Sequence, residues 1–373
     1  MSTSRKKAMA THGGEVFRLA AEFGLEPEKI IDFSANINPL GLPCGVDSAL
    51  HKALQNLANY PEIGAESLRL RLAERHKLGV ENVIVGNGSS ALIYLLSRAF
   101  KPKKALILAP TFTEYERALR LVNSEVFNLI CLVPEKNISL KEIIKAITEK
   151  QPELVFLCNP NNPTGDLWSV WELEEIVTAL SRAGIICILD EAFIDFVGSE
   201  SSLATRVEKF DNLIILRSLT KIYALAGIRC GYLLCNRSLN RLLSRFLEPW
   251  SVNSLALGAA AAALENDQDF IQETIAFVTR ERKFLSEKLS QFIFIKPFPA
   301  TANYILVQVD SSVDCGKLSE YLFIRSKILI RRCGDYIGLD DNYVRFAVKK
   351  EGENRKLLEA LSVFQDTLIE KRD

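Results

Sequence analysis

Short, almost wholly apolar segments alternate with helical patterns between about residue 80 and residue 240, and this alternation constrains the fold most. Six segments have the length and composition of buried strands: 83–85, 105–109, 154–157, 185–189, 213–216 and 231–234. The sequence between them has helical spacing at 90–100, 115–122 and 170–183. Strands that are apolar on both faces and alternate with helices predict an α/β fold, with a mostly parallel central sheet flanked by helices.

The pattern changes after about residue 250, where longer charged helical segments replace the alternation. Helices are expected at 268–292 and 351–370, with strands at 302–309, 328–330 and 343–348. This mixture predicts a smaller α+β domain. We therefore expect an N-terminal segment that packs with the small domain and the active site, a large cofactor-binding domain and a small C-terminal domain, with the boundaries 1–45, 46–260 and 261–373.

Composition excludes several classes of protein. The chain has 46 basic and 46 acidic residues, so its charge does not favour bulk binding of nucleic acid or of an anionic membrane. Residues 1–11 are polar and basic, unlike a signal peptide, and the apolar run 255–264 is too short to span a bilayer. Eight cysteines without a CxxC pair indicate a reduced cytoplasmic protein, and three scattered histidines do not predict a metal site.

Lys221 comes just after the apolar segment 213–216, where a lysine is costly unless it has a task. One such task is a Schiff base with an aldehyde cofactor, because a partly desolvated amine loses its proton readily. Ser218 and Arg229 lie on either side of Lys221 and could hold a phosphate, which together suggests pyridoxal phosphate. The alternative is a surface lysine in a loop.

Three further motifs follow predicted strands. The glycine loop 85–91 leads into a helix and could bind a phosphate at the helix N-terminus, or could be only a tight turn. The segment 158–165, CNPNNPTG, forms a rigid turn that could direct an amide over the strand end. Asp190 ends a buried strand and needs a cationic partner, which could be a protonated pyridine nitrogen or a nearby arginine.

These four motifs, in this order and spacing, resemble fold-type I pyridoxal-phosphate enzymes, in particular class I/II aminotransferases near the histidinol-phosphate aminotransferases. The chain is also similar to the L-threonine-O-3-phosphate decarboxylases of cobalamin synthesis, in segments that extend the resemblance from His12 to the final helix: 12–14, 32–41, 249–253 and 328–339.

The resemblance implies a role for each matching residue. Lys221 would form the internal aldimine, Asp190 would pair with the pyridine nitrogen and Asn162 would contact the ring hydroxyl. The other implied cofactor contacts are Phe112 on the ring face and, at the phosphate, Gly88, Ser89, Ser218 and Arg229. These enzymes are homodimers with shared sites, so Tyr60 would reach the cofactor phosphate of the neighbouring subunit. The implied substrate contacts are Arg345 with Asn36 at the carboxylate, and His12 with Arg331 at the phosphate.

The implied function is decarboxylation of O-phospho-L-threonine to (R)-1-aminopropan-2-yl phosphate for the cobalamin nucleotide loop, through an external aldimine and a quinonoid. Alternatives are O-phospho-L-serine decarboxylation, which gives ethanolamine phosphate, and histidinol-phosphate aminotransferase activity. Phe193 stands where many transaminases have a tyrosine, which fits the decarboxylases. A non-catalytic cofactor-binding regulator is disfavoured by the complete set of Lys221, Asp190 and Asn162 and by the lack of a basic stripe.

Overall fold

A computed structural model describes residues 13–131, 133, 138–265 and 267–370. Its larger sheet has seven strands in the order β2-β8-β7-β6-β5-β3-β4. Only β8 runs antiparallel to its neighbours, so the predicted mostly parallel sheet is confirmed. The strands are β2 (Val83–Gly86), β3 (Lys104–Ala109), β4 (Glu125–Ile130), β5 (Leu154–Cys158), β6 (Ile186–Asp190), β7 (Leu213–Ser218) and β8 (Gly231–Cys235).

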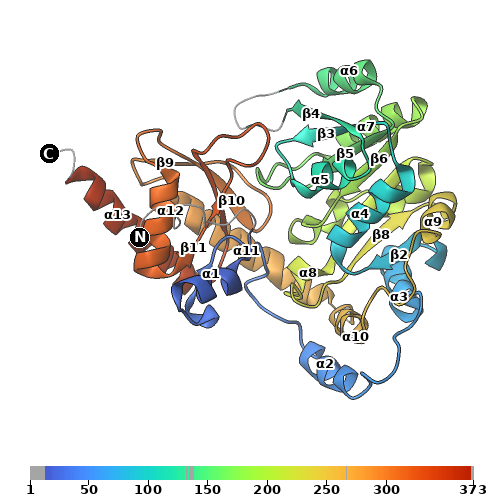
Figure 1. Cartoon of the computed structure of the whole chain (residues 1–373), viewed down its shortest axis with the longest axis horizontal. Coiled ribbons are helices and arrows are strands. Elements are labelled where there is room, and N and C mark those ends of the chain that lie inside the picture. The colour runs from blue at the N-terminus through green and yellow to red at the C-terminus, as the bar shows by residue number, and fades with distance from the viewer. Residues whose placement is uncertain (1–12, 132, 134–137, 266, 371–373) are drawn as a thin grey trace.

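Helices cover both faces of this sheet (Figure 1). Alternate strand residues face opposite ways, so Val83 and Val85 join the core under one set of helices and Ile84 joins the core under the other. One face packs against α3 (Glu66–His76), α6 (Leu140–Lys150), α7 (Val170–Arg182) and α10 (Ser254–Ala263). The other packs against α4 (Gly88–Phe100), α5 (Glu114–Arg120) and α9 (Arg237–Ser244).

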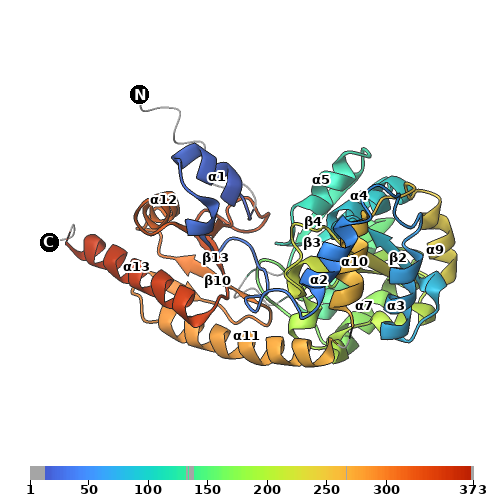
Figure 2. The same cartoon turned by 90° about the horizontal axis from the view of Figure 1, so that it is seen from below.

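A second, antiparallel sheet has the order β12-β13-β10-β9 and lies beside the first (Figure 2). The long helix α11 (Gln268–Leu289) extends from one sheet to the other, and its end packs into the second core through Leu285 and Leu289. The other elements are β9 (Ile295–Pro297), β10 (Tyr304–Val309), α12 (Cys315–Ser326), β12 (Arg331–Arg332), β13 (Tyr343–Ala347) and α13 (Glu351–Ile369).

The N-terminal part contacts both units. After α1 (Val16–Phe23), strand β1 (Ile31–Asp32) pairs in parallel with β11 (Ile328–Leu329). The Asn38 side chain then donates to the carbonyl of Ile222 at 2.7 Å, next to Lys221. Helix α2 (Val46–Leu54) lies against α10. No helix within the described residues is both long and apolar enough to cross a membrane.

Candidate active site

A cavity of about 510 Å³ lies at the carboxyl ends of the parallel strands, and residues of both sheets line it. Lys221, Asp190, Asn162 and Phe112 end or follow β7, β6, β5 and β3, which are neighbours in that order. The fold therefore sets these four positions side by side along one sheet edge, where open α/β sheets bind ligands. Seven of the residues expected at the site line the cavity: Asn36, Phe112, Asn162, Lys221, Arg229, Arg331 and Arg345.

Lys221 lies in the short helix α8 (Leu219–Ile222), directly after β7. Its Nζ is 3.2 Å from the Ser218 hydroxyl, which lies 2.7 Å from the Thr220 hydroxyl. Burial lowers the pKa of Lys221 to about 8, although the Asp190 carboxylate acts in the opposite direction. An amine with this pKa has a free-base fraction of about a tenth at pH 7, far more than an ordinary lysine, and its free form can attack an aldehyde.

Asp190 is only 4% exposed at the end of β6. Its carboxylate accepts hydrogen bonds from the Tyr115 hydroxyl at 2.6 Å and from the Ala192 N–H at 2.8 Å. Burial raises its pKa, and both hydrogen bonds oppose that shift. The arginine salt bridge at this strand end belongs to the next residue, Glu191, which pairs with Arg217 at 2.9 Å.

Asn162 and its turn connect the two sheets. The neighbouring Asn161 stiffens the turn by donating to the Pro110 carbonyl at 2.9 Å and to the Thr164 hydroxyl at 2.8 Å. The side-chain oxygen of Asn162 accepts a hydrogen bond from the Arg345 guanidinium on β13. Asn162 is therefore placed between the strand ends of the large sheet and the arginine side of the cavity.

The start of α4 fits a phosphate group. Gly88 is the first residue of this helix and has φ +80°, and a Cβ there would lie 2.6 Å from Nη2 of Arg229. On β8, a Cβ on Gly231 would lie 2.5 Å from the backbone nitrogen of Ser89. Because Gly88 and Gly231 have no side chains, the N–H groups at the start of α4 lie close to the Arg229 guanidinium. Free N–H groups beside a cation favour the binding of an anion. Ser218 pairs with Gly231 across β7 and β8, so its hydroxyl belongs to the same region.

Arg331 and Arg345 are directly opposite each other on the antiparallel pair β12 and β13, so their side chains leave the same face. Arg331 donates to the Asp335 carboxylate at 2.6 Å and lies 5.0 Å from the Tyr336 ring centroid. Arg345 donates to neutral acceptors, Asn162 and the Ser34 carbonyl. Both side chains are nearly fully buried, at 3% and 4% exposure.

Two polar atoms of the cavity residues are buried without a hydrogen-bond partner among the described residues, Nε of Arg345 and Oδ1 of Asn36. A buried polar group without a partner is costly, and a polar ligand would relieve this cost. The cavity thus combines cationic groups on its small-sheet side with a nucleophilic amine on its large-sheet side.

Of the other expected site residues that the structure describes, five do not line the cavity: Gly88, Ser89, Asp190, Ser218 and Tyr60. The first four belong to the strand and helix ends described above. Tyr60 is 81% exposed and lies against Trp250, with 4.8 Å between the ring centroids. His12 lies outside the described residues. Sequence reasoning in turn assigned no role to Tyr115, Arg117 or Tyr336, of which the last two line the cavity. Tyr115 follows Phe112 at a spacing of three residues, so helical spacing was an available signal for Tyr115.

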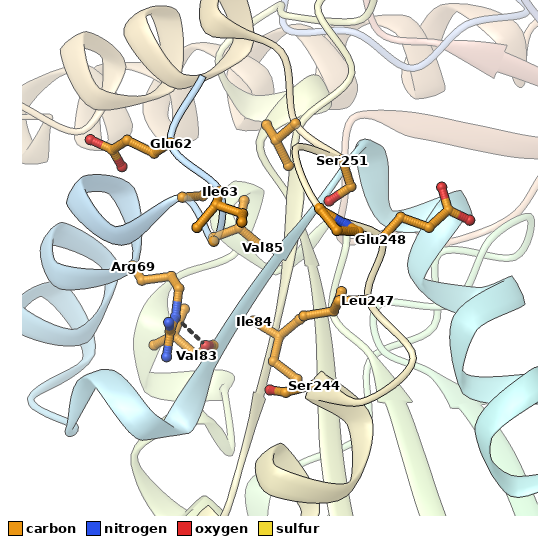
Figure 3. A pocket seen from close by; sticks show the side chains of 14 residues that line it. Glu62, Ile63, Arg69, Val83, Ile84, Val85, Ser244, Leu247, Glu248 and Ser251 are labelled. Carbon is orange, nitrogen blue, oxygen red and sulfur yellow. Dashed lines mark hydrogen bonds between the residues drawn. The ribbon is translucent and has the colours of Figure 1, made fainter. Parts of the chain in front are cut away.

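A second cavity, of about 280 Å³, lies along the outer strand β2 and the segment 247–252, near Tyr60 and Trp250 (Figure 3). Figure 3 shows the Arg69 side chain beside β2, where its Nε donates to the Val83 carbonyl at 2.9 Å. Arg69 and Asn240 both bond this carbonyl, so side chains cover part of the strand's free edge. This cavity lacks the lysine and paired arginines of the first one.

A lysine with a lowered pKa, a buried carboxylate at the next strand end and an anion-binding helix start together define an enzyme that uses pyridoxal 5′-phosphate, on the fold-type I architecture. The chain belongs to the class I and II aminotransferase family, whose family model matches residues 28–361.

Its similarity to individual proteins covers nearly the whole chain. It is 35% identical to a threonine-phosphate decarboxylase of Salmonella typhimurium, over 94% of this chain and 96% of that protein. It is 31% identical to a histidinol-phosphate aminotransferase of Methanothermobacter thermautotrophicus, over 94% and 92% of the two chains. The crystal structure of the histidinol-phosphate aminotransferase from Clostridium acetobutylicum superposes with a TM-score of 0.83 at 32% identity, over 90% and 99% of the two chains.

Proposed function

We propose that this enzyme decarboxylates O-phospho-L-threonine to (R)-1-aminopropan-2-yl phosphate, the aminopropanol precursor of the cobalamin nucleotide loop. The observation that carries the proposal is the pair of buried arginines, Arg331 and Arg345, directly opposite each other and lining the same cavity as Lys221. A substrate with a carboxylate and a phosphate offers one anion to each guanidinium. Arginine suits both groups because it binds them through two parallel hydrogen bonds. The similarity to a threonine-phosphate decarboxylase supports the same reading.

The placement of the side chains supports the proposed cofactor contacts. Pyridoxal phosphate supplies the electron sink that accepts the bonding electrons from the substrate Cα. Lys221 holds the cofactor through its Nζ, Asp190 faces the ring nitrogen and Asn162 the ring hydroxyl. Phe112 covers the ring face. The phosphate is held by Gly88, Ser89, Ser218 and Arg229.

The proposed substrate contacts decide which bond breaks. Arg345, assisted by Asn36, holds the carboxylate, and Arg331 with His12 holds the phosphate. By fixing both ends of the substrate, Arg345 and Arg331 would set the torsion about Cα and so would select the bond to Cα that the cofactor's electron sink weakens. The Nζ of Lys221 would deliver a proton to Cα. Its pKa of about 8 suits it to carry a proton near neutral pH.

The test of this function is product analysis. We expect the purified enzyme with pyridoxal phosphate to release carbon dioxide from O-phospho-L-threonine in the absence of 2-oxoglutarate. Slower release from O-phospho-L-serine would identify the methyl group as a specificity element, since a hydrophobic pocket discriminates a methyl by about 1–3 kcal/mol. Faster release from phosphoserine would assign ethanolamine phosphate as the product instead.

The second candidate is histidinol-phosphate aminotransferase, which the similarity to proteins of that name favours. Its amino substrate also carries a phosphate and an amine but no carboxylate, so in this candidate Arg345 would hold a carboxylate of the co-substrate 2-oxoglutarate instead. Phe193 has no hydroxyl with which to contact the ring oxygen, and its ring centroid lies 5.7 Å from Nζ of Lys221. Formation of glutamate from histidinol phosphate and 2-oxoglutarate, without carbon dioxide release from phosphothreonine, would replace the decarboxylase by this candidate.

We also propose a homodimer in which Tyr60 reaches the cofactor phosphate of the neighbouring subunit. Tyr60 does not line its own chain's cavity, and its ring packs against the exposed Trp250. The large apolar side chains nearest to it in sequence, Leu54, Leu57 and Ile63, are exposed as well. Exposed apolar patches of this kind mark interfaces. Sedimentation of the purified protein would reveal a monomer if the proposal is wrong.

Two further parts of the proposal concern organisation and environment. The boundaries 45/46 and 260/261 are supported by the two sheets, which occupy Val83–Cys235 and Ile295–Ala347, and by the pairing of β1 with β11. A reducing cytoplasm is supported by the cysteines, since seven of the eight are buried and no two of them form a CxxC pair. Limited proteolysis, with mass analysis of the fragments, would locate the boundaries.

A further inference from the structure

Tyr115 joins two of the residues that the cofactor ring would touch. Its hydroxyl donates to the Asp190 carboxylate at 2.6 Å, and its ring meets Phe112 edge to face with 5.7 Å between centroids. The ring of Tyr115 is stacked on Phe156 of β5, at 4.6 Å and an interplanar angle of 9°. A ring packed this firmly holds its hydroxyl in one place.

The ionisation states of this pair favour a one-way hydrogen bond. Burial raises the pKa of Tyr115 well above its ordinary value, so the phenol keeps its proton and acts as the donor. Burial also raises the pKa of Asp190, and the bond from Tyr115 works against that shift. The phenol therefore stabilises the charged form of a carboxylate, which burial disfavours.

We propose that Tyr115 is a positioning residue that holds Asp190 charged and aimed at the ring nitrogen of pyridoxal phosphate, and so sustains the protonated pyridine. The proposal rests on the proposed role of Asp190, and it applies to decarboxylation and transamination alike because both need the electron sink. Without the Tyr115 hydroxyl, the Asp190 carboxylate would stabilise the protonated pyridine ring less, and the ring would become a weaker electron sink. The contacts of Arg331 and Arg345 with the substrate would not change.

The variant Y115F removes the hydroxyl and keeps the stacked ring. We expect it to lower kcat about tenfold with KM within about twofold, as loss of one hydrogen bond to a charge implies. The Kd of the apoenzyme for pyridoxal phosphate should rise less, about threefold, because Asp190 keeps its hydrogen bond from Ala192 and the proposed phosphate contacts are untouched. The turnover assay uses phosphothreonine, or histidinol phosphate with 2-oxoglutarate if that is the substrate. The Kd, measured by fluorescence titration, does not depend on the reaction.

The matched control is Y232F. Tyr232 is also buried and its hydroxyl lies 2.9 Å from Nε2 of His76, but it belongs to the core on the opposite face of the sheet. Y232F should leave kcat and the cofactor Kd within about twofold of the wild type, because the Tyr232 hydroxyl bonds His76 and not a residue of the proposed cofactor site. Melting temperatures of the four apoproteins (wild type, Y115F, Y232F and D190N) report any general loss of stability.

The double variant Y115F/D190N separates positioning from packing. If Tyr115 acts through Asp190, Y115F costs no further activity or affinity once Asp190 is replaced. An equal loss in both backgrounds, or no change of kcat and Kd in Y115F, would overturn the inference while leaving the role of Asp190 intact. If D190N itself changes neither quantity, the proposed role of Asp190 is wrong and the inference falls with it.

Discussion

In the proposed function, Lys221 is the residue whose protonation would control attachment of the cofactor. Burial lowers its pKa to about 8 from the ordinary 10.5. Below that pH the folded apoprotein carries an ammonium, which cannot attack an aldehyde. We expect the rate of covalent attachment of pyridoxal phosphate to rise about tenfold per pH unit below pH 8 and to level off above it, as the fraction of free amine does. Stopped-flow absorbance of the apoenzyme measures this rate, with K221A as the control that lacks the covalent phase.

A level rate from pH 6 to pH 10 would contradict this prediction, and so would a midpoint near 10.5, which would mean that Lys221 is not desolvated in the apoprotein.

Arg331 is the residue that the phosphate proposal depends on most. Successive strand residues face opposite ways, so the side chain of its neighbour Arg332 points away from the cavity, where it pairs with Asp341 at 3.2 Å. We expect R331Q to lower kcat/KM for phosphothreonine about tenfold to a hundredfold, as loss of a charge-assisted pair implies. R332Q, on the same strand, should stay within about threefold. Steady-state kinetics with both variants measures the difference, and equal losses would remove Arg331 from the phosphate site.

At the scale of elements, the start of α4 gives the sharpest prediction. G88A would require a Cβ 2.6 Å from Nη2 of Arg229, at a φ of +80° that residues other than glycine avoid. We expect Arg229 to be displaced and the Kd for pyridoxal phosphate to rise about tenfold or more, since one charge-assisted contact is lost. The control is G352A, because a Cβ on Gly352 meets no atom within 4 Å. Fluorescence titration measures both, and an unchanged Kd in G88A would show that Arg229 does not hold the phosphate.

The six strands of the large sheet with uniform apolar character were predictable, and β4 was not. Its sequence, EVFNLI, mixes polar and apolar residues because it is an outer strand with one neighbour, β3, and is half-buried. The short strands β1, β9 and β12 were missed as separate elements, since two or three residues carry no periodic signal. Polar residues at strand ends were visible in the sequence, whereas Tyr115 reaches Asp190 only through the placement of α5.

At the scale of the whole molecule, the two sheets meet at the cavity, and the sequence could not show how. Asn162 and Arg345 are 183 positions apart, and their hydrogen bond joins the large sheet to the small one. Arg345 also donates to the Ser34 carbonyl at 2.7 Å, which ties in the N-terminal segment. Such contacts depend on how the two units pack, which local sequence patterns do not encode. Only the resemblance to known enzymes predicted that these residues belong to one site.

The proposed sharing of sites between subunits gives the last prediction. If Tyr60 completes the site of the neighbouring subunit, a dimer of one K221A chain and one Y60F chain holds one intact site, built from Lys221 of the Y60F chain and Tyr60 of the K221A chain. Its other site carries both defects. Random exchange of subunits makes half of the dimers mixed, so activity should recover to about a quarter of the wild-type value in a two-fold symmetric dimer.

The experiment mixes the two inactive or impaired proteins under conditions that exchange subunits, and then assays them at a limiting concentration of pyridoxal phosphate, where loss of a phosphate contact is most visible. Unmixed samples taken through the same exchange provide the baseline. Activity that exceeds the average of the two parents supports a shared site, because neither parent contains both residues in one site. Activity equal to that average would mean that Tyr60 serves its own chain or no site at all, and the proposed dimer would then have to be built on another face.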